Sequence, residues 1–66
     1  MRYGFVGLGN MGGPMACRLA EQGQSVTAFD LSSSACEVVA ASGAAVASSV
    51  HEMAGQVDAV FVCLPS

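Results

Sequence analysis

Short apolar runs alternate along this chain with segments whose apolar residues recur at helical spacing. Four runs have the length and composition of buried strands, at residues 3–8, 25–29, 44–46 and 57–64. Between them, the spacing and the capping signals predict helices at residues 11–22, 34–42 and 49–55. Strands that alternate with helices in this way predict right-handed crossovers and a parallel sheet, so the chain is expected to be an α/β protein.

The expected starts of the second and third helices rest on paired polar residues. Ser34 precedes Glu37, and Ser49 precedes Glu52, at the spacing of a capping box. In the first helix, Pro14 is expected within about the first turn, where its missing N–H costs little. Met15 is expected to pack in the core, and Gly23 is expected to cap the C-terminal end of the helix.

A glycine-rich turn joins the first expected strand to the first expected helix. Gly7, Gly9 and Gly12 form the pattern G-x-G-x-x-G within one β-α-β unit. The first glycine permits a tight turn, the second lets the backbone approach a diphosphate, and the third lets the helix pack closely on the sheet. Amides near Asn10 and Met11 then face the anion, with the helix dipole adding roughly half a positive charge. The loop therefore predicts a dinucleotide site.

Asp30 closes the second expected strand, at about the spacing from the loop where an acidic residue binds the adenosine ribose. A carboxylate there repels a 2′-phosphate, and Leu31 follows it in place of a basic residue, which favours NAD over NADP. The alternative is that Asp30 is a turn residue. Ser32 is interpreted as a turn or cap residue, with contact to the adenosine end as its alternative.

Composition narrows the class of protein. The chain has 66 residues, of which 53% are hydrophobic and 11% are charged, and its net charge is −3. Arg2 and Arg18 are its strong bases and it contains no lysine, which argues against nucleic-acid binding and against a basic membrane-surface helix. We also expect no membrane span, because no apolar run is long enough.

The remaining chemically active side chains are interpreted conservatively. The three cysteines lack C-x-x-C spacing, are expected to be small buried residues, and suit a reducing compartment, so a cytoplasmic location is expected. His51 and Asp58 are expected to be solvated. No cluster has the spacing of a metal site, and none is expected.

The segment F-V-G-L-G-N-M-G-G-P-M-A-C-R-L, residues 5–19, resembles the signature of the β-hydroxyacid dehydrogenases. That family includes 3-hydroxyisobutyrate dehydrogenase, tartronate semialdehyde reductase and 6-phosphogluconate dehydrogenase. The closing V-F-V-C-L-P-S is similar to the family's fourth strand and the loop that follows it, and the Asn10-Met11 pair is most similar to 3-hydroxyisobutyrate dehydrogenase. The resemblance implies a partial Rossmann-type, doubly wound parallel sheet, with residues 1–66 as the N-terminal part of a dinucleotide-binding domain and no internal boundary.

The resemblance also implies a set of cofactor contacts. Asp30 would bind the adenosine ribose of NAD, and Leu64 and Pro65 would lie on the nicotinamide side. The strand order 3-2-1-4 supports this, since the ends of the first and fourth strands then flank the ligand crevice. The residues implied at the pyrophosphate are Gly7, Leu8, Gly9, Asn10, Met11 and Gly12.

The complete enzyme would transfer a hydride between NAD and a small 3-hydroxy acid, and it is expected to be a homo-oligomer. The family's catalytic lysine and its substrate-binding residues lie later in the chain than residue 66, so no catalytic residue is expected here. One alternative is a non-catalytic module that binds a dinucleotide for sensing or assembly. A second is a flavoprotein, which uses the same glycine pattern but does not need Leu8, Met11 and Met15.

Overall fold

The structure is a computed structural model that describes residues 1–63, and at Asn10 and Met11 it describes the backbone alone. Strands and helices alternate in the predicted order. The strands are β1 (Arg2–Val6), β2 (Ser25–Phe29), β3 (Ala45–Val46) and β4 (Ala59–Val62). The helices are α1 (Gly9–Glu21), α2 (Ser33–Ala41) and α3 (Val50–Ala54). Among these, no helix combines the length and the apolar character needed to cross a membrane.

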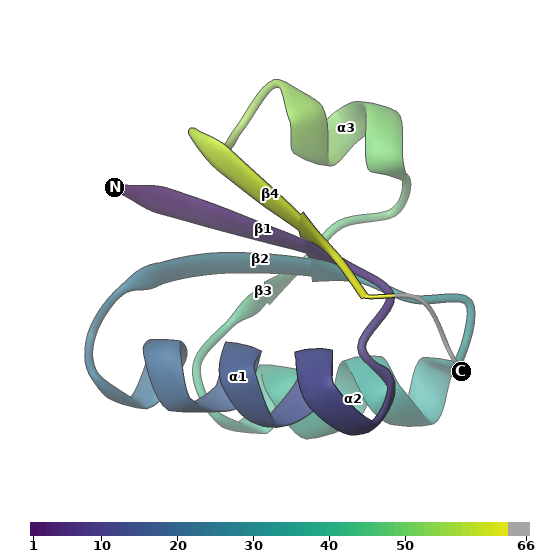
Figure 1. The fold of residues 1–66 in the computed structure, drawn as a ribbon. Coiled ribbons are helices and arrows are strands. Elements are labelled where there is room, and N and C mark those ends of the chain that lie inside the picture. Colours follow the sequence, from purple (N-terminus) through teal and green to yellow (C-terminus); the bar gives the residue numbers. More distant parts are fainter. Residues whose placement is uncertain (64–66) are drawn as a thin grey trace.

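The four strands form one parallel sheet in the order β3-β2-β1-β4. Val6, at the end of β1, lies opposite Phe29 on one side and Val62 on the other. Helices α1 and α2 cover one face of the sheet and α3 covers the other (Figure 1). The predicted strand order and the partial Rossmann-type fold are therefore confirmed, and the carboxyl ends of β1, β2 and β4 meet at one edge.

The main core lies between the sheet and the pair α1 and α2. Its buried residues come from β1, the loop after it, α1, β2, α2 and the residue before β3: Phe5, Leu8, Ala16, Val26, Ala28, Val39 and Ala44. On the other face, Met53 of α3 is fully buried against Gly4, where an added Cβ would lie 2.8 Å from the methionine sulfur. Burial of these apolar groups is the main source of stability for a chain of this size.

Near its start the inward side of α1 is made of small residues, whereas Leu19 packs against the core further along the helix. Ala16 is fully buried, whereas Met15 is 44% exposed, so the expectation that Met15 packs in the core is wrong. The reason is the close approach of the helix to the loop after β1, where a Cβ at Gly12 would lie 2.7 Å from the carbonyl oxygen of Gly7. Such close contact leaves no room for a long side chain at this end of the helix, and Met15 lies on the outer side.

Helix α1 begins earlier than expected, but it ends at the expected glycine cap. The helix begins at Gly9, two residues early, so Pro14 falls in its second turn rather than its first. At the other end, Gly23 has a φ of 85° and donates its N–H to the carbonyl of Ala20 at 3.0 Å. The N–H of the following Gln24 bonds one residue further back, which completes a Schellman cap.

Helix α2 starts one residue before its expected position. Its N-cap is Ser32, whose hydroxyl accepts a hydrogen bond from the N–H of Ala35 at 3.4 Å. The predicted capping box of Ser34 and Glu37 is therefore wrong, because Ser34 already lies inside the helix. The chain turns earlier than its polar spacing indicates because the turn after β2 is fixed by Asp30.

Helix α3 starts with the predicted cap. The hydroxyl of Ser49 accepts a hydrogen bond from the N–H of Glu52 at 3.1 Å. The carboxylate of Glu52 reaches past Ser49 to Ser48, whose hydroxyl and N–H donate to it at 2.8 and 3.2 Å. These bonds hold the pKa of Glu52 below its usual value, the hydroxyl of Ser48 being the larger cause.

Asp58 precedes β4 and is exposed, as expected, but its carboxylate is also paired. Its carboxylate accepts a hydrogen bond from the backbone N–H of Arg2 at 2.8 Å and pairs with the guanidinium at 3.1 Å. The Asp58 N–H returns a bond to the carbonyl of Arg2 at 2.8 Å. These contacts join the start of β1 to the start of β4.

Strand β4 forms one edge of the described sheet, yet it carries apolar side chains on both faces. Val60 and Val62 are 47% and 63% exposed. Phe61 packs its ring 5.1 Å from that of Phe5, between ring centroids, and remains 39% exposed. This is the composition of a strand that is covered on both sides in a parallel sheet.

Candidate functional site

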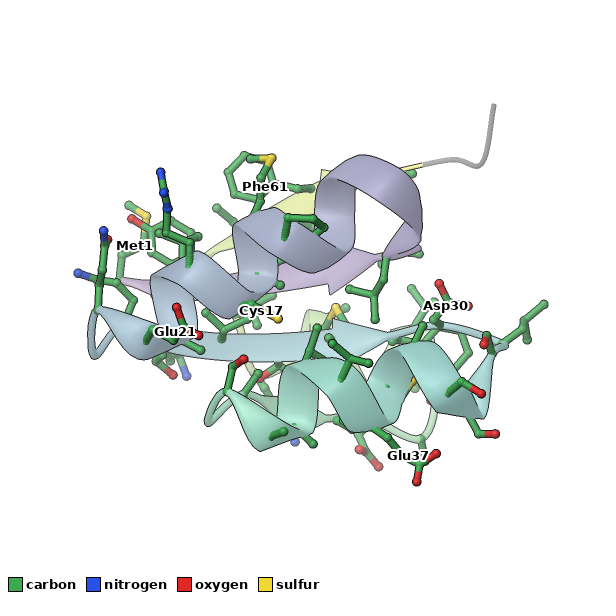
Figure 2. The ribbon with its side chains drawn as sticks, turned by 90° about the horizontal axis from the view of Figure 1, so that it is seen from below. Met1, Cys17, Glu21, Asp30, Glu37 and Phe61 are labelled. Carbon is green, nitrogen blue, oxygen red and sulfur yellow. The ribbon has the colours of Figure 1, made fainter. Side chains whose placement is uncertain are left out.

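A cavity of about 530 Å³ opens at the edge where the strands β1, β2 and β4 end. In open α/β sheets, ligands bind outside the carboxyl ends of the strands, where the strand order reverses. Figure 2 shows Asp30 at the end of the molecule where α1 and α2 begin. The residues lining the cavity are Val6, Gly7, Gly9, Phe29, Asp30, Leu31, Ser32, Ala35 and Cys63.

Gly7 makes the turn out of β1 in a place that no other residue fits. Its φ is 81°, in the left-handed region, and its N–H donates to the carbonyl of Phe29 at 2.9 Å. A Cβ at this position would collide with the carbonyl oxygen of Cys63. The tight turn expected from the glycine pattern is therefore present, and it lies against the end of β4.

Gly9 and Gly12 have opposite surroundings. A Cβ added to Gly12 would lie 2.9 Å from the Cβ of Cys63, which agrees with the expected close packing of the helix. A Cβ added to Gly9 would have no atom within 4 Å, because this residue faces the cavity and open solvent. A ligand can thus approach the backbone at Gly9, and its contact with a diphosphate stays a prediction.

The N-terminus of α1 is the one among the three helices described that has no side-chain cap. Its N-cap residue is Leu8, whereas Ser32 and Ser49 cap the other two helices. The first turn carries the backbone of Asn10 and Met11 and contains no acidic residue. Because the first amides of a helix have no partner within the helix, this end of α1 has the polarity to hold an anion.

Leu8 contributes to the shape of the loop. Its side chain is 1% exposed and lies in the core, and its N–H donates to the Oδ2 atom of Asp30 at 2.7 Å. The expected contact of Leu8 with a diphosphate stays a prediction. In this structure the amide of Leu8 is directed at a carboxylate of the protein itself.

Asp30 is half-buried and accepts two backbone hydrogen bonds. Its Oδ1 atom accepts the N–H of Ser32 at 2.8 Å, and its Oδ2 atom accepts that of Leu8. These bonds hold the pKa of Asp30 below its usual value, with the Ser32 amide as the larger cause. The site therefore has a fixed, ionised carboxylate at its edge, as ribose recognition requires.

Several cavity residues were not recognised as site residues from the sequence, among them Cys63 and Leu31. Cys63 was interpreted only as a small buried residue, but it is half-buried and lines the cavity beside Gly7. Leu31 is 94% exposed and lies next to Asp30 on the same rim. The available signal for Cys63 was its place directly after the fourth strand, next to the glycine loop in a 3-2-1-4 sheet.

Other expected residues lie elsewhere. Leu64 and Pro65 fall outside the described residues, so their place on the nicotinamide side stays a prediction. His51 is exposed on α3, on the other face of the sheet. Within residues 1–63, no three His, Cys, Asp or Glu side chains come together as a metal site.

Comparison with known proteins agrees with this geometry. Residues 2–66 match the sequence family described as the NAD binding domain of 6-phosphogluconate dehydrogenase. The chain is 46% identical over 63 residues to the mitochondrial 3-hydroxyisobutyrate dehydrogenase of Drosophila melanogaster, which covers 96% of the chain and 19% of that protein. It is 39% identical over 66 residues to the 2-(hydroxymethyl)glutarate dehydrogenase of Eubacterium barkeri, covering 100% of the chain and 22% of that protein.

A third relative, the mitochondrial 3-hydroxyisobutyrate dehydrogenase of Mus musculus, is 41% identical over 63 residues, with 96% of the chain and 19% of the relative covered. The chain thus spans about a fifth of the length of the curated relatives that it matches. All three relatives are named as dehydrogenases.

Proposed function

Because the chain belongs to the family described as the NAD binding domain of 6-phosphogluconate dehydrogenase, we propose that it holds NAD across the cavity at the carboxyl edge of its sheet. The observation that carries this proposal is the pairing of an open Gly9 with the uncapped start of α1. Together they offer backbone amides and a helix dipole to a diphosphate, in a chain that has no lysine to do so.

The residues that we propose to contact the cofactor are those that the family resemblance implies. Asp30 would accept hydrogen bonds from the adenosine ribose, and Leu64 with Pro65 would lie beside the nicotinamide. The diphosphate would lie against the loop residues Gly7, Leu8, Gly9, Asn10, Met11 and Gly12. An ionised carboxylate at Asp30 also supports NAD over NADP, since a 2′-phosphate would meet a like charge there.

For the whole protein, we propose an oxidoreductase that passes a hydride between NAD and a small 3-hydroxy acid. The bound nicotinamide supplies the hydride chemistry, and this chain positions it. Residues 1–66 would be part of a larger dinucleotide-binding domain, which the apolar faces of β4 and the length of the relatives support. A lysine elsewhere in the complete enzyme would be the acid and base, and a homo-oligomer is expected. A cytoplasmic location stays a prediction, because several of the relatives are named as mitochondrial.

Titration of the full chain with NADH, followed by nucleotide fluorescence, tests the proposal. We expect saturable binding that Gly9→Ala weakens at least tenfold, because a methyl group then occupies the space of the diphosphate. Gly9 has a φ of 42°, so the substitution also costs about 1–2 kcal/mol of backbone strain.

Gly23→Ala is the matched control for that strain. Gly23 also has a positive φ, of 85°, with no atom within 4 Å of an added Cβ, and it lies at the far end of α1. It should lose similar stability but keep the wild-type affinity for NADH. Equal affinities of the wild type and Gly9→Ala for NADH would show that the diphosphate does not bind at this loop.

A further inference from the structure

The carboxylate of Asp30 links two elements that a bound dinucleotide would bridge. Its Oδ2 atom accepts the N–H of Leu8, 22 residues earlier in the chain, at 2.7 Å. Leu8 is the N-cap of α1, and Asp30 directly follows the last residue of β2. The hydrogen bond therefore ties the end of β2 directly to the glycine loop.

We propose that Asp30 is a positioning residue that holds the glycine loop in its diphosphate-binding shape before any nucleotide arrives. The proposal rests on the proposed function, since it assigns a second task to a residue of that same site. It predicts that Asp30 contributes to binding of the diphosphate even when the ligand has no ribose hydroxyl groups for it to contact.

The surroundings of the Leu8 amide make this bond important for the loop. The Leu8 side chain is buried, so its N–H lies at the edge of the core, where an unpaired amide is costly. The N–H of the preceding Gly7 is already bound to the carbonyl of Phe29. A hydrogen bond to an ionised carboxylate is stronger than one to a neutral acceptor, so Asp30 fixes the loop at its last residue before α1.

The carboxylate itself cannot swing away from the loop without losing a second bond. Its Oδ1 atom accepts the N–H of Ser32 at 2.8 Å, and Ser32 is in turn the N-cap of α2. A carboxylate has about four acceptor positions, so two remain for ribose hydroxyl groups. Positioning the loop and binding the ribose are therefore compatible in one residue.

Few charged groups compete with this arrangement. The titratable side chains that line the cavity, among the residues described, are Asp30 itself and the thiol of Cys63 from the end of β4. From α2, the thiol of Cys36 donates to the carbonyl oxygen of Asp30 at 3.5 Å. No basic side chain lines the described cavity, so the diphosphate depends on the ordered backbone of the loop.

The test compares two ligands on the full chain: NADH, and an NADH analogue whose adenosine ribose lacks both hydroxyl groups. If Asp30 only bound the ribose, Asp30→Ala would lower the affinity for NADH and leave the affinity for the analogue unchanged. We expect Asp30→Ala to bind the analogue at least fivefold more weakly than the wild type does. Asp30→Asn, which keeps the size and one acceptor oxygen, should fall between the wild type and Asp30→Ala and serves if the alanine variant does not fold.

Glu37→Ala is the control for loss of a negative charge near an anionic ligand. Glu37 is exposed on α2, outside the cavity, and Figure 2 shows it on the outer side of that helix. Removal of either carboxylate takes away a negative charge and should by itself raise the affinity for an anionic ligand. If only Asp30→Ala binds the analogue more weakly, the cause is therefore the altered glycine loop. An unchanged affinity of Asp30→Ala for the analogue would overturn the proposal.

Amide NMR of the nucleotide-free chain gives a readout that is independent of binding. The Leu8 amide proton should shift in acid together with the carboxyl group of Asp30, and that pH dependence should vanish in Asp30→Asn. A Leu8 amide that does not respond would also overturn the proposal. If NADH fails to bind the wild type while the Leu8 amide responds, the proposed function is wrong and the hydrogen bond is a purely structural one.

Discussion

Gly12, in the first half of α1, touches Cys63 at the end of β4 so closely that a Cβ at position 12 would lie 2.9 Å from the Cβ of Cys63. The same Cβ would lie 2.7 Å from the carbonyl oxygen of Gly7. The glycine loop, the start of α1 and the end of β4 therefore form one close-packed junction beside the cavity, and the stability of this junction is open to test.

Gly12→Ala should lower the free energy of unfolding by up to about 2 kcal/mol. Overpacking costs about 1–3 kcal/mol, and the gain of about 1 kcal/mol in helix propensity offsets only part of it for contacts as close as these. Gly13→Ala is the matched control, since its Cβ would find its nearest neighbour at 3.8 Å. It should instead raise stability by up to about 1 kcal/mol. Urea unfolding of both variants checks this, and equal effects would contradict the close packing.

Cofactor preference should move toward NADPH when the carboxylate at the rim is replaced by a cation. The double variant Asp30→Ala with Leu31→Arg removes the like charge and adds a base on an exposed rim residue. We expect the ratio of NADPH to NADH affinity to rise at least tenfold in parallel titrations. Asp30→Ala with Leu31→Met, which has a long side chain without charge, should shift the ratio much less. An unchanged ratio in the arginine variant would exclude Asp30 from nucleotide selection.

Acid should destabilise the chain below the ordinary carboxyl pKa of about 4. Arg2, chiefly through its side-chain hydrogen bond, lowers the pKa of Asp58, and the pKa values of Asp30 and Glu52 are lowered too. A carboxyl group with a lowered pKa in the folded state stabilises the fold above its unfolded pKa, and this contribution is lost as the pH falls through the folded value.

Urea midpoints measured between about pH 7 and pH 2 check this direction, since carboxyl groups titrate within that range. The midpoint should stay level down to about pH 4 and then fall. Asp58→Asn should lower the midpoint at neutral pH and flatten the fall in acid, because one of the responsible groups is gone. A midpoint that rises in acid would contradict the assigned hydrogen bonds.

The two candidate caps of α2 can be separated by alanine substitution. Ser32→Ala removes the hydroxyl that accepts from the N–H of Ala35, and it should cost about 0.5–1 kcal/mol. Ser34 lies inside the helix and is exposed, so Ser34→Ala should be neutral or slightly stabilising. Thermal or urea unfolding decides between the two caps. A larger loss of stability in Ser34→Ala than in Ser32→Ala would support the capping box that the sequence predicts.

The alternation of strands and helices could be predicted because it depends on local patterns. Apolar runs and helical spacing gave all seven elements in the right order, and the second strand matched at both ends. Gly7, Gly9 and Gly12 were identified in the same way, since their spacing reflects a local turn. The expected boundary at Ser34 was wrong because Asp30 accepts the N–H of Ser32, two residues later, and Ser32 then caps α2 in place of Ser34.

By itself, therefore, the sequence determined the parallel α/β fold and the position of the glycine loop, because side-chain periodicity and glycine spacing act over a few residues. The expected strand order came with the family resemblance and not from these local patterns. The tertiary structure alone decided the bond of Asp30 to Leu8, the pairing of Asp58 with Arg2, and the outward place of Met15. The two hydrogen-bonded pairs join positions 22 and 56 residues apart. The two bonds and the position of Met15 depend on the strand register and on the close approach of α1 to the loop after β1. No short segment of the sequence encodes either of these.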